Sequence, residues 1–124
     1  MPGRRDEIIG SLLYQEDREK ILTMVRKMGN MVSEAIASAV QSLESRDNAL
    51  ADRIIEADDI VDDLEVEIDQ ECLSSIALRQ PLRKDLRFVF AVLKIITDLE
   101  RVGDQAVNIA KRAKALNRYP LLKP

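Results

Sequence analysis

Four carboxylates form two pairs in this sequence, and each pair has the spacing of one helical turn. Glu100 and Asp104 are four residues apart, and so are Asp58 and Asp62 in the preceding periodic stretch. Side chains at i and i+4 project from the same face of a helix. Carboxylates at the edge of a buried surface need neutralisation. Arg or Lys side chains can supply it, and so can a metal ion.

The segment around Asp58 and Asp62 is unusually acidic. Nine of the 16 residues from 56 to 71 are Asp or Glu, and no Lys or Arg lies between residues 53 and 79. Glu65 and Asp69 continue the spacing of Asp58 and Asp62, which predicts a carboxylate stripe roughly 16 Å long on a helix. Basic residues of the next helix offer a metal-free way to balance it, namely Arg83, Lys84, Arg87, Lys94 and Arg101. The residues alone leave both readings open.

The chain has no His, and this narrows the chemistry. Ser-His and Cys-His catalysis and His-ligated zinc are excluded. Carboxylate oxygens favour hard ions such as iron, manganese, magnesium or calcium over zinc or copper. Arg101 either holds a stripe carboxylate in place or faces solvent, and Asn108 is either a further oxygen ligand or an interhelical hydrogen-bonding residue. Gly103, beside Asp104, leaves room for close helix approach or for a bound group.

Composition indicates one all-helical domain. The 124 residues are 46% hydrophobic, contain only four aromatic residues and carry a net charge of −3, which argues against broad nucleic-acid or anionic-membrane binding. A single cysteine, Cys72, fits a reducing compartment. We expect a cytoplasmic protein, because the sequence has no apolar run of membrane-spanning length and no signal-peptide core.

Periodicity predicts three antiparallel helices in an up-down-up bundle. Asp47 is the expected N-cap of the second helix, and Pro81 ends that helix and opens the third. Gly10 and Ser11 weaken continuity near the N-terminus. The expected segments are an extension or short helix at 1–14, a three-helix domain at 15–116 with helices at about 16–46, 48–79 and 82–115, and a tail at 117–124.

The third helix carries more apolar surface than two partners cover. One stripe runs from Leu86 to Ala110 and a second from Phe88 to Ala113, together spanning well over half of the circumference. Three more helices are therefore expected to complete a six-helix bundle, from a second chain or from sequence missing here. The predicted seam of the first helix is Leu22, Val25, Gly29, Val32, Ile36, Ala39 and Leu43.

The runs Arg-Gln-Pro-Leu-Arg-Lys-Asp-Leu-Arg at 79–87 and Asp-Leu-Glu-Arg-Val-Gly-Asp-Gln-Ala-Val-Asn-Ile-Ala at 98–110 resemble the PhoU family of bacterial phosphate-homeostasis regulators. The resemblance extends over roughly residues 20–115. It implies a three-helix repeat that normally occurs twice, and an acidic motif that in some members binds iron or other metal clusters. That motif maps onto Asp58 with Asp62 and onto Glu100 with Asp104. This sequence departs from the family in having one repeat.

The resemblance implies a function in restraining phosphate uptake and phosphate-starvation signalling. The leading hypothesis is a metal-binding helical adaptor, not an enzyme, that forms a homodimer and docks on a membrane-associated phosphate transporter and its sensor kinase. It would neither bind nucleic acid nor insert into a membrane. The alternatives are a cytosolic module of a sodium-phosphate cotransporter, a metal-free dimerisation bundle, and a carboxylate-ligated metalloenzyme. The last lacks a nucleophile and a Gly-rich phosphate loop.

Overall fold

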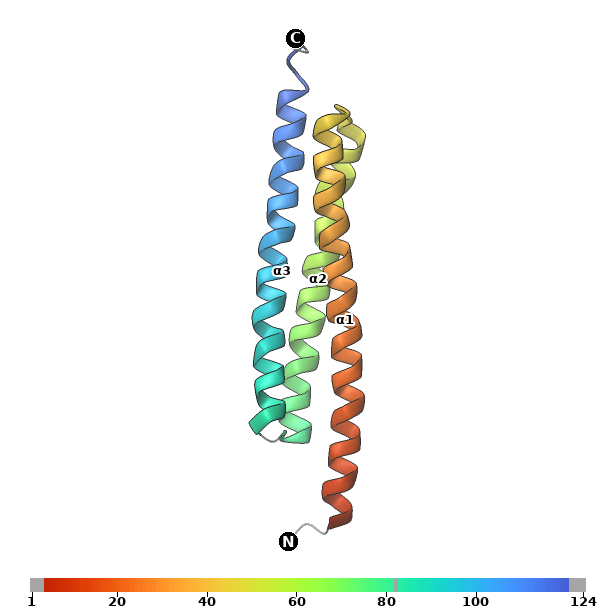
Figure 1. Ribbon diagram of the computed structural model, residues 1–124, viewed down its shortest axis with the longest axis vertical. Helices are drawn as coiled ribbons and strands as arrows, with labels where there is room; N and C mark the ends of the chain where they lie inside the picture. The colour runs from red at the N-terminus through yellow and green to blue at the C-terminus, as the bar shows by residue number, and fades with distance from the viewer. Residues whose placement is uncertain (1–3, 82, 121–124) are drawn as a thin grey trace.

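The chain folds into three long antiparallel helices that run up, down and up (Figure 1). The computed structural model describes residues 4–81 and 83–120, and it describes side chains of the first helix from Tyr14 onward. The helices are α1 (Arg4–Glu44), α2 (Asn48–Arg79) and α3 (Arg83–Leu116). The predicted all-α bundle is therefore confirmed. Residues 1–3 of the predicted extension, the predicted helix start at 82 and tail residues 121–124 lie outside the described residues.

Helix α1 is longer than predicted. It runs without interruption from Arg4 through Gly10 and Ser11, so no separate short helix precedes it. A glycine in a helix interior costs only about 1 kcal/mol, which is less than starting a new helix requires. The helix ends at Glu44 and not at the predicted residue 46, because Arg46 has a φ of 55° and leaves the helical conformation. At its N-terminal end α1 projects past the connection between α2 and α3 (Figure 1).

Specific polar contacts fix both connections. The side chain of Asp47 accepts a hydrogen bond from the backbone N–H of Leu50 at 3.0 Å, which confirms it as the N-cap of α2. Beside it, the guanidinium of Arg46 donates to the backbone carbonyls of Asn117 and Tyr119. At the other end of the bundle, the hydroxyl of Tyr14 donates to the backbone carbonyl of Asp85 at 2.9 Å. Each end of the bundle thus joins residues that are far apart in the sequence.

The buried core consists of two separate apolar clusters along the bundle axis. The larger one is built from bulky side chains and lies toward the connection between α2 and α3. The smaller one is rich in alanine and lies toward the connection between α1 and α2. Asp58 and Gly103 occupy the stretches of α2 and α3 between them. The larger cluster contains Ile21, Met28, Val32, Val61, Leu64, Ile68, Cys72, Val89, Val92 and Ile96, and the smaller one Ala39, Ala51, Ile54, Ala106 and Ala110.

The buried seam of α1 differs from the predicted one. From Tyr14 onward its buried residues are Tyr14, Ile21, Met28, Val32, Ala39 and Ser42, of which Val32 and Ala39 were predicted seam residues. Predicted seam residues such as Gly29 and Ile36 are half-buried, and Leu43 is 41% exposed. The apolar stripe of α1 is broad, and the predicted seam follows the edge that adjoins α3. Residues on this edge lie at three- and four-residue steps from Arg18, whose guanidinium stacks on the Phe88 ring of α3 at 4.5 Å.

Apolar surface remains exposed along α1 and α3. Steps of seven from Phe88 lead to Ile95 and Val102, which are 44% and 43% exposed. Val40 and Leu43 of α1 are each 41% exposed. We call these four exposed residues the α1/α3 apolar edge. None of the described helices combines the length and hydropathy that a membrane crossing needs.

Candidate functional site

Five carboxylates lie near the contact between α2 and α3. On α2, Ala51, Asp58, Glu65 and Cys72 follow one another at steps of seven, so two carboxylates occupy positions whose neighbours in the series are fully buried. Asp58 and Glu65 are accordingly half-buried. Antiparallel packing brings Gly103 of α3 beside Asp58: a Cβ built on Gly103 lies 3.5 Å from the Asp58 carboxylate. The carboxylate cluster is defined as Asp58, Asp62, Glu65, Glu100 and Asp104.

Electrostatic coupling joins the members on the two helices. Burial raises the pKa of the Asp58 carboxyl above 3.8, and the negative charges of Asp62 and Asp104 raise it further. Lys111 opposes this with a smaller, lowering effect on the same pKa. Burial also raises the pKa of Asp62, with Asp104 as its strongest charged neighbour. The charge of Asp104 on α3 therefore raises the pKa of both Asp58 and Asp62 on α2.

The same coupling includes the two glutamates. Burial raises the pKa of Glu65, and the charges of Asp62, Asp69 and Asp104 add to the effect. Burial raises the pKa of Glu100 as well, followed by a side-chain hydrogen bond with Asp104 and by the charges of Asp104, Glu65 and Asp62. The two predicted i, i+4 pairs thus lie within electrostatic reach of each other, and Glu65 interacts with members of both pairs.

Basic side chains form no ion pair with the carboxylate cluster in the described part of the chain. Arg101 is exposed and its guanidinium lies 3.7 Å from Asp98 on its own helix, so it does not hold a stripe carboxylate. Asn108 and Asp69 are exposed, and no hydrogen bond to a cluster member is found for either within the described chain.

The cluster has the right donors for a hard cation but does not form a finished ligand set. Within residues 14–81 and 83–120, no three Asp, Glu or Cys side chains converge closely enough to hold a metal ion. Binding an ion would require the carboxylates to rotate toward one another, since Ca²⁺–oxygen distances, for example, are about 2.3–2.6 Å.

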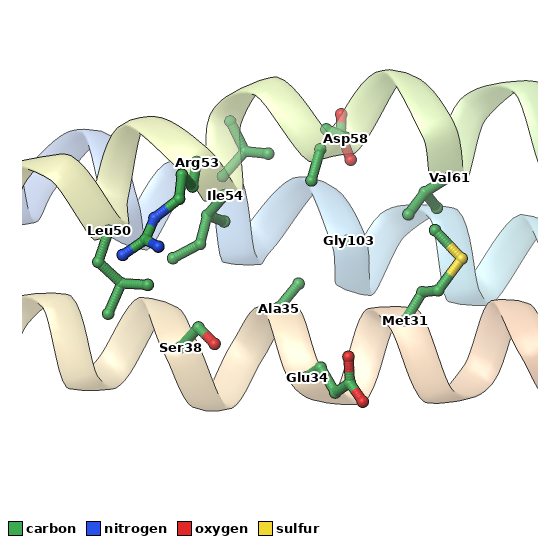
Figure 2. A pocket seen from close by; sticks show the side chains of 12 residues that line it. Met31, Glu34, Ala35, Ser38, Leu50, Arg53, Ile54, Asp58, Val61 and Gly103 are labelled. Atoms are coloured by element: carbon green, nitrogen blue, oxygen red, sulfur yellow. The ribbon is translucent and has the colours of Figure 1, made fainter.

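A groove of about 290 Å³ opens on the face between α1 and α2 (Figure 2). Its depth comes from small residues at one level of the bundle: Ala35 on α1, Ala57 on α2 and Gly103 on α3. This groove was not expected from the sequence, although these three small residues could have indicated it. Its lining is Met31, Glu34, Ala35, Ser38, Leu50, Arg53, Ile54, Ala57, Asp58, Val61, Gly103 and Val107.

Comparison with known proteins adds an independent line of evidence. A family model described as the PhoU domain matches residues 25–113. The phosphate-specific transport system accessory protein PhoU homolog of Aquifex aeolicus is 44% identical over 110 residues, which are 89% of this chain and 48% of that protein. The Escherichia coli K12 accessory protein PhoU is 41% identical over 100 residues, covering 81% of this chain and 42% of that protein.

A solved structure agrees with these relatives. The crystal structure of PhoU from Pseudomonas aeruginosa superposes with a TM-score of 0.82 at 35% identity, over 85% of this chain and 50% of that one. The chain spans about half the length of the curated relatives it matches. Matching sequence, helical architecture and domain extent lead to one conclusion: the chain belongs to the PhoU family.

Proposed function

We propose that this protein is a regulatory accessory component of bacterial phosphate uptake and not an enzyme. The observation that carries the proposal is the 44% identity, over 89% of the chain, to a protein named for a phosphate-specific transport system. By this proposal it acts in the cytoplasm, restrains the membrane-associated transporter, and reports to the sensor kinase of phosphate starvation.

Complementation tests this proposal directly. The chain is expressed in a bacterium that lacks its own PhoU accessory protein, both as a single copy and as a tandem fusion of two copies, because the relatives are about twice as long. The expected result is a lower rate of radiolabelled phosphate uptake in at least one of the two strains. Unchanged uptake in both strains, with folded helical protein present in each, would contradict the proposal.

The carboxylate cluster is proposed to bind a metal ion, with iron preferred and manganese, magnesium or calcium as alternatives. Asp58, Asp62, Glu100 and Asp104 would be the principal ligands, with Glu65 as a further donor. The proposal is supported by two helices that supply oxygen donors at one level, and by the absence of a counter-ion to them among the described ion pairs. A bound cation would supply the missing positive charge.

Metal titration distinguishes this site from general surface acidity. Ferric or manganous ions are added to the wild-type protein and to a Glu100→Gln, Asp104→Asn double variant, and retained metal is measured after dialysis. Asp98→Asn serves as the control, because Asp98 is an exposed acid on the same helix that pairs with Arg101. The wild type and the control should retain metal and the double variant should not. Equal retention by all three proteins would remove the proposal.

We also propose that a second copy of the chain covers the α1/α3 apolar edge. The four residues of this edge are each more than 40% exposed. Gly29 lies in the same row of α1, and a Cβ built on it meets no atom within 4 Å. A glycine in mid-helix that no neighbour within the chain requires is suited to the close approach of another helix.

Sedimentation equilibrium tests the dimer at micromolar concentration. Val102→Glu places a charge on the apolar edge and should convert the dimer to a monomer. Val66→Glu is the matched control, because Val66 is 53% exposed on α2 and lies outside the edge. A monomeric wild type, or a dimer that survives Val102→Glu, would contradict this part of the proposal.

A further inference from the structure

The groove between α1 and α2 lies at the break in the hydrophobic core. Its walls are apolar over most of their length, with Ala35 and Met31 on one side and Ile54, Ala57 and Val61 on the other. These side chains come from two different helices and leave about 290 Å³ between them. The space is large enough for one long side chain from another molecule.

Two carboxylates line this groove at one level from opposite helices, toward its Met31 end. The Lys20 ammonium and the Glu71 carboxylate are 2.7 Å apart, so these residues lie at one level of α1 and α2. Helices rise equally per residue, so 14 residues further along α1 and 13 residues back along α2 lead to one common level, that of Glu34 and Asp58. Neither carboxylate has an ion-pair partner among the described residues.

The other end of the groove is different. Arg53 lies five residues before Asp58 on α2, which is about 7.5 Å along the helix axis. Figure 2 shows Arg53 near Leu50 and Ser38, while Glu34 and Asp58 are found toward the Met31 end. The groove therefore carries a cationic side chain toward its Leu50 end and two carboxylates toward its Met31 end, with apolar residues between them.

Gly103 forms the inner wall of the groove beside Asp58. A Cβ there would meet the Asp58 carboxylate at 3.5 Å, Val32 at 3.7 Å and Val61 at 3.8 Å, which are ordinary contact distances. Alanine would therefore fit and would favour the helix. Packing within this chain does not require glycine, and what glycine provides is open space next to the carboxylate.

We propose that this groove binds the side chain of a lysine from a partner protein. The aliphatic stem would lie along the apolar walls, and the ammonium would sit at the end bordered by Glu34 and Asp58. A lysine side chain has this division between apolar stem and charged head, and its ammonium carries three donors and no acceptor. The two carboxylates disfavour a phosphate or carboxylate ligand at that end. The proposal does not depend on the phosphate function, and it applies to the metal-free protein, because a metal ion held by Asp58 would compete with the ammonium.

A titration followed by two-dimensional NMR of the backbone amides tests the proposal in metal-chelating buffer. The probe is Nα-acetyl-lysine-N-methylamide, and its control is the norleucine counterpart, which keeps the stem and lacks the ammonium. The lysine probe should give saturable shifts at the amides of Ala57 and Gly103, with a dissociation constant on the order of millimolar. The norleucine probe should bind at least about fivefold more weakly.

Variants assign the charge to the two carboxylates. Glu34→Gln and Asp58→Asn should each weaken the lysine probe by about two- to fivefold. Asp59→Asn should leave affinity unchanged, because Asp59 is an exposed neighbour that does not line the groove. Equal binding of the two probes, shifts that never saturate, or equal effects of all three variants would overturn the proposal. Groove shifts that depend on protein concentration alone would also overturn it, by identifying a second copy as the occupant.

Discussion

Replacing Asp104 with asparagine should stabilise the metal-free protein at neutral pH. Asp104 raises the pKa of Asp58, Asp62, Glu65 and Glu100, so its charge opposes the ionisation of all four. A like-charge pair one turn apart on a helix costs about 0.2–0.5 kcal/mol. Each of the water-screened interactions across helices is of similar or smaller size, roughly 0.2–0.5 kcal/mol.

These terms together give a gain of about 1 kcal/mol for Asp104→Asn. In a domain of this length, that corresponds to a rise in Tm of about 3–6 °C. Asn and Asp have similar helix propensities, so the backbone contributes little to the difference. Asp98→Asn is the matched control: it removes an exposed pair with Arg101, so it should lower stability slightly, by about 0.3 kcal/mol or less.

The gain in stability from Asp104→Asn should be present at neutral pH and lost at low pH. Asp58, Asp62, Glu65 and Glu100 have pKa values raised on folding. The folded protein therefore binds more protons than the unfolded chain near the titration range of these four acids. Their ionisation therefore reduces stability as pH rises through that range, and the penalty is complete at pH 7. Below about pH 3.5 the acids are largely protonated in both states, and the difference between variant and wild type should disappear.

Thermal unfolding followed by circular dichroism, at low salt with a chelator, measures both effects. An Asp104→Asn protein that melts at or below the wild-type temperature at pH 7 would refute the reasoning. A stabilisation that persists unchanged at pH 3.5 would do so as well. Added salt should shrink the gain, because screening weakens the repulsion it removes.

Three further substitutions test the packing and the caps through urea unfolding. Ser75→Ala should raise the unfolding free energy by up to about 1 kcal/mol, because the buried Ser75 hydroxyl has no hydrogen-bond partner in the described structure; a clear loss would contradict this. Asp47→Ala should lower it by about 1 kcal/mol through loss of the bond to the Leu50 N–H, whereas Asp47→Asn should keep most of the stability. Tyr14→Phe should cost about 1 kcal/mol by removing the bond to the Asp85 carbonyl, and an unchanged midpoint would count against that contact.

The number and direction of the helices could be predicted from the sequence, but the seam of α1 could be predicted only in part, at Val32 and Ala39. Three long periodic stretches with Asp47 and Pro81 between them have only short connections, and short connections require antiparallel neighbours. The apolar stripe of α1 is wider than the core it faces. Leu22 and Ile21 are therefore equally good seam residues on sequence grounds, and only the placement of α2 and α3 selects Ile21 for full burial.

The site shows a similar division. Spacing placed Glu100 with Asp104 and Asp58 with Asp62, and the antiparallel fold brought the two pairs together. The side-chain rotamer of Arg101 decides which carboxylate it pairs with, and the periodicity of the sequence does not determine that rotamer. The hydrogen bonds from Arg46 to the backbone carbonyls of Asn117 and Tyr119 were also not predicted, because the partners are separated by 71 and 73 positions in the sequence.

The division of the core into two clusters has a consequence for the local unfolding of the bundle. Van der Waals contacts scale with side-chain size. The three helices are therefore packed less firmly around the alanine-rich cluster, near the turn at Arg46 and Asp47, than around the cluster of Ile, Met and Val side chains. Amide protons there should exchange sooner with solvent than those near Ile68 and Val89. A molecule bound in the groove between the two core clusters would contact both of them, and would therefore make the two parts of the bundle unfold more cooperatively.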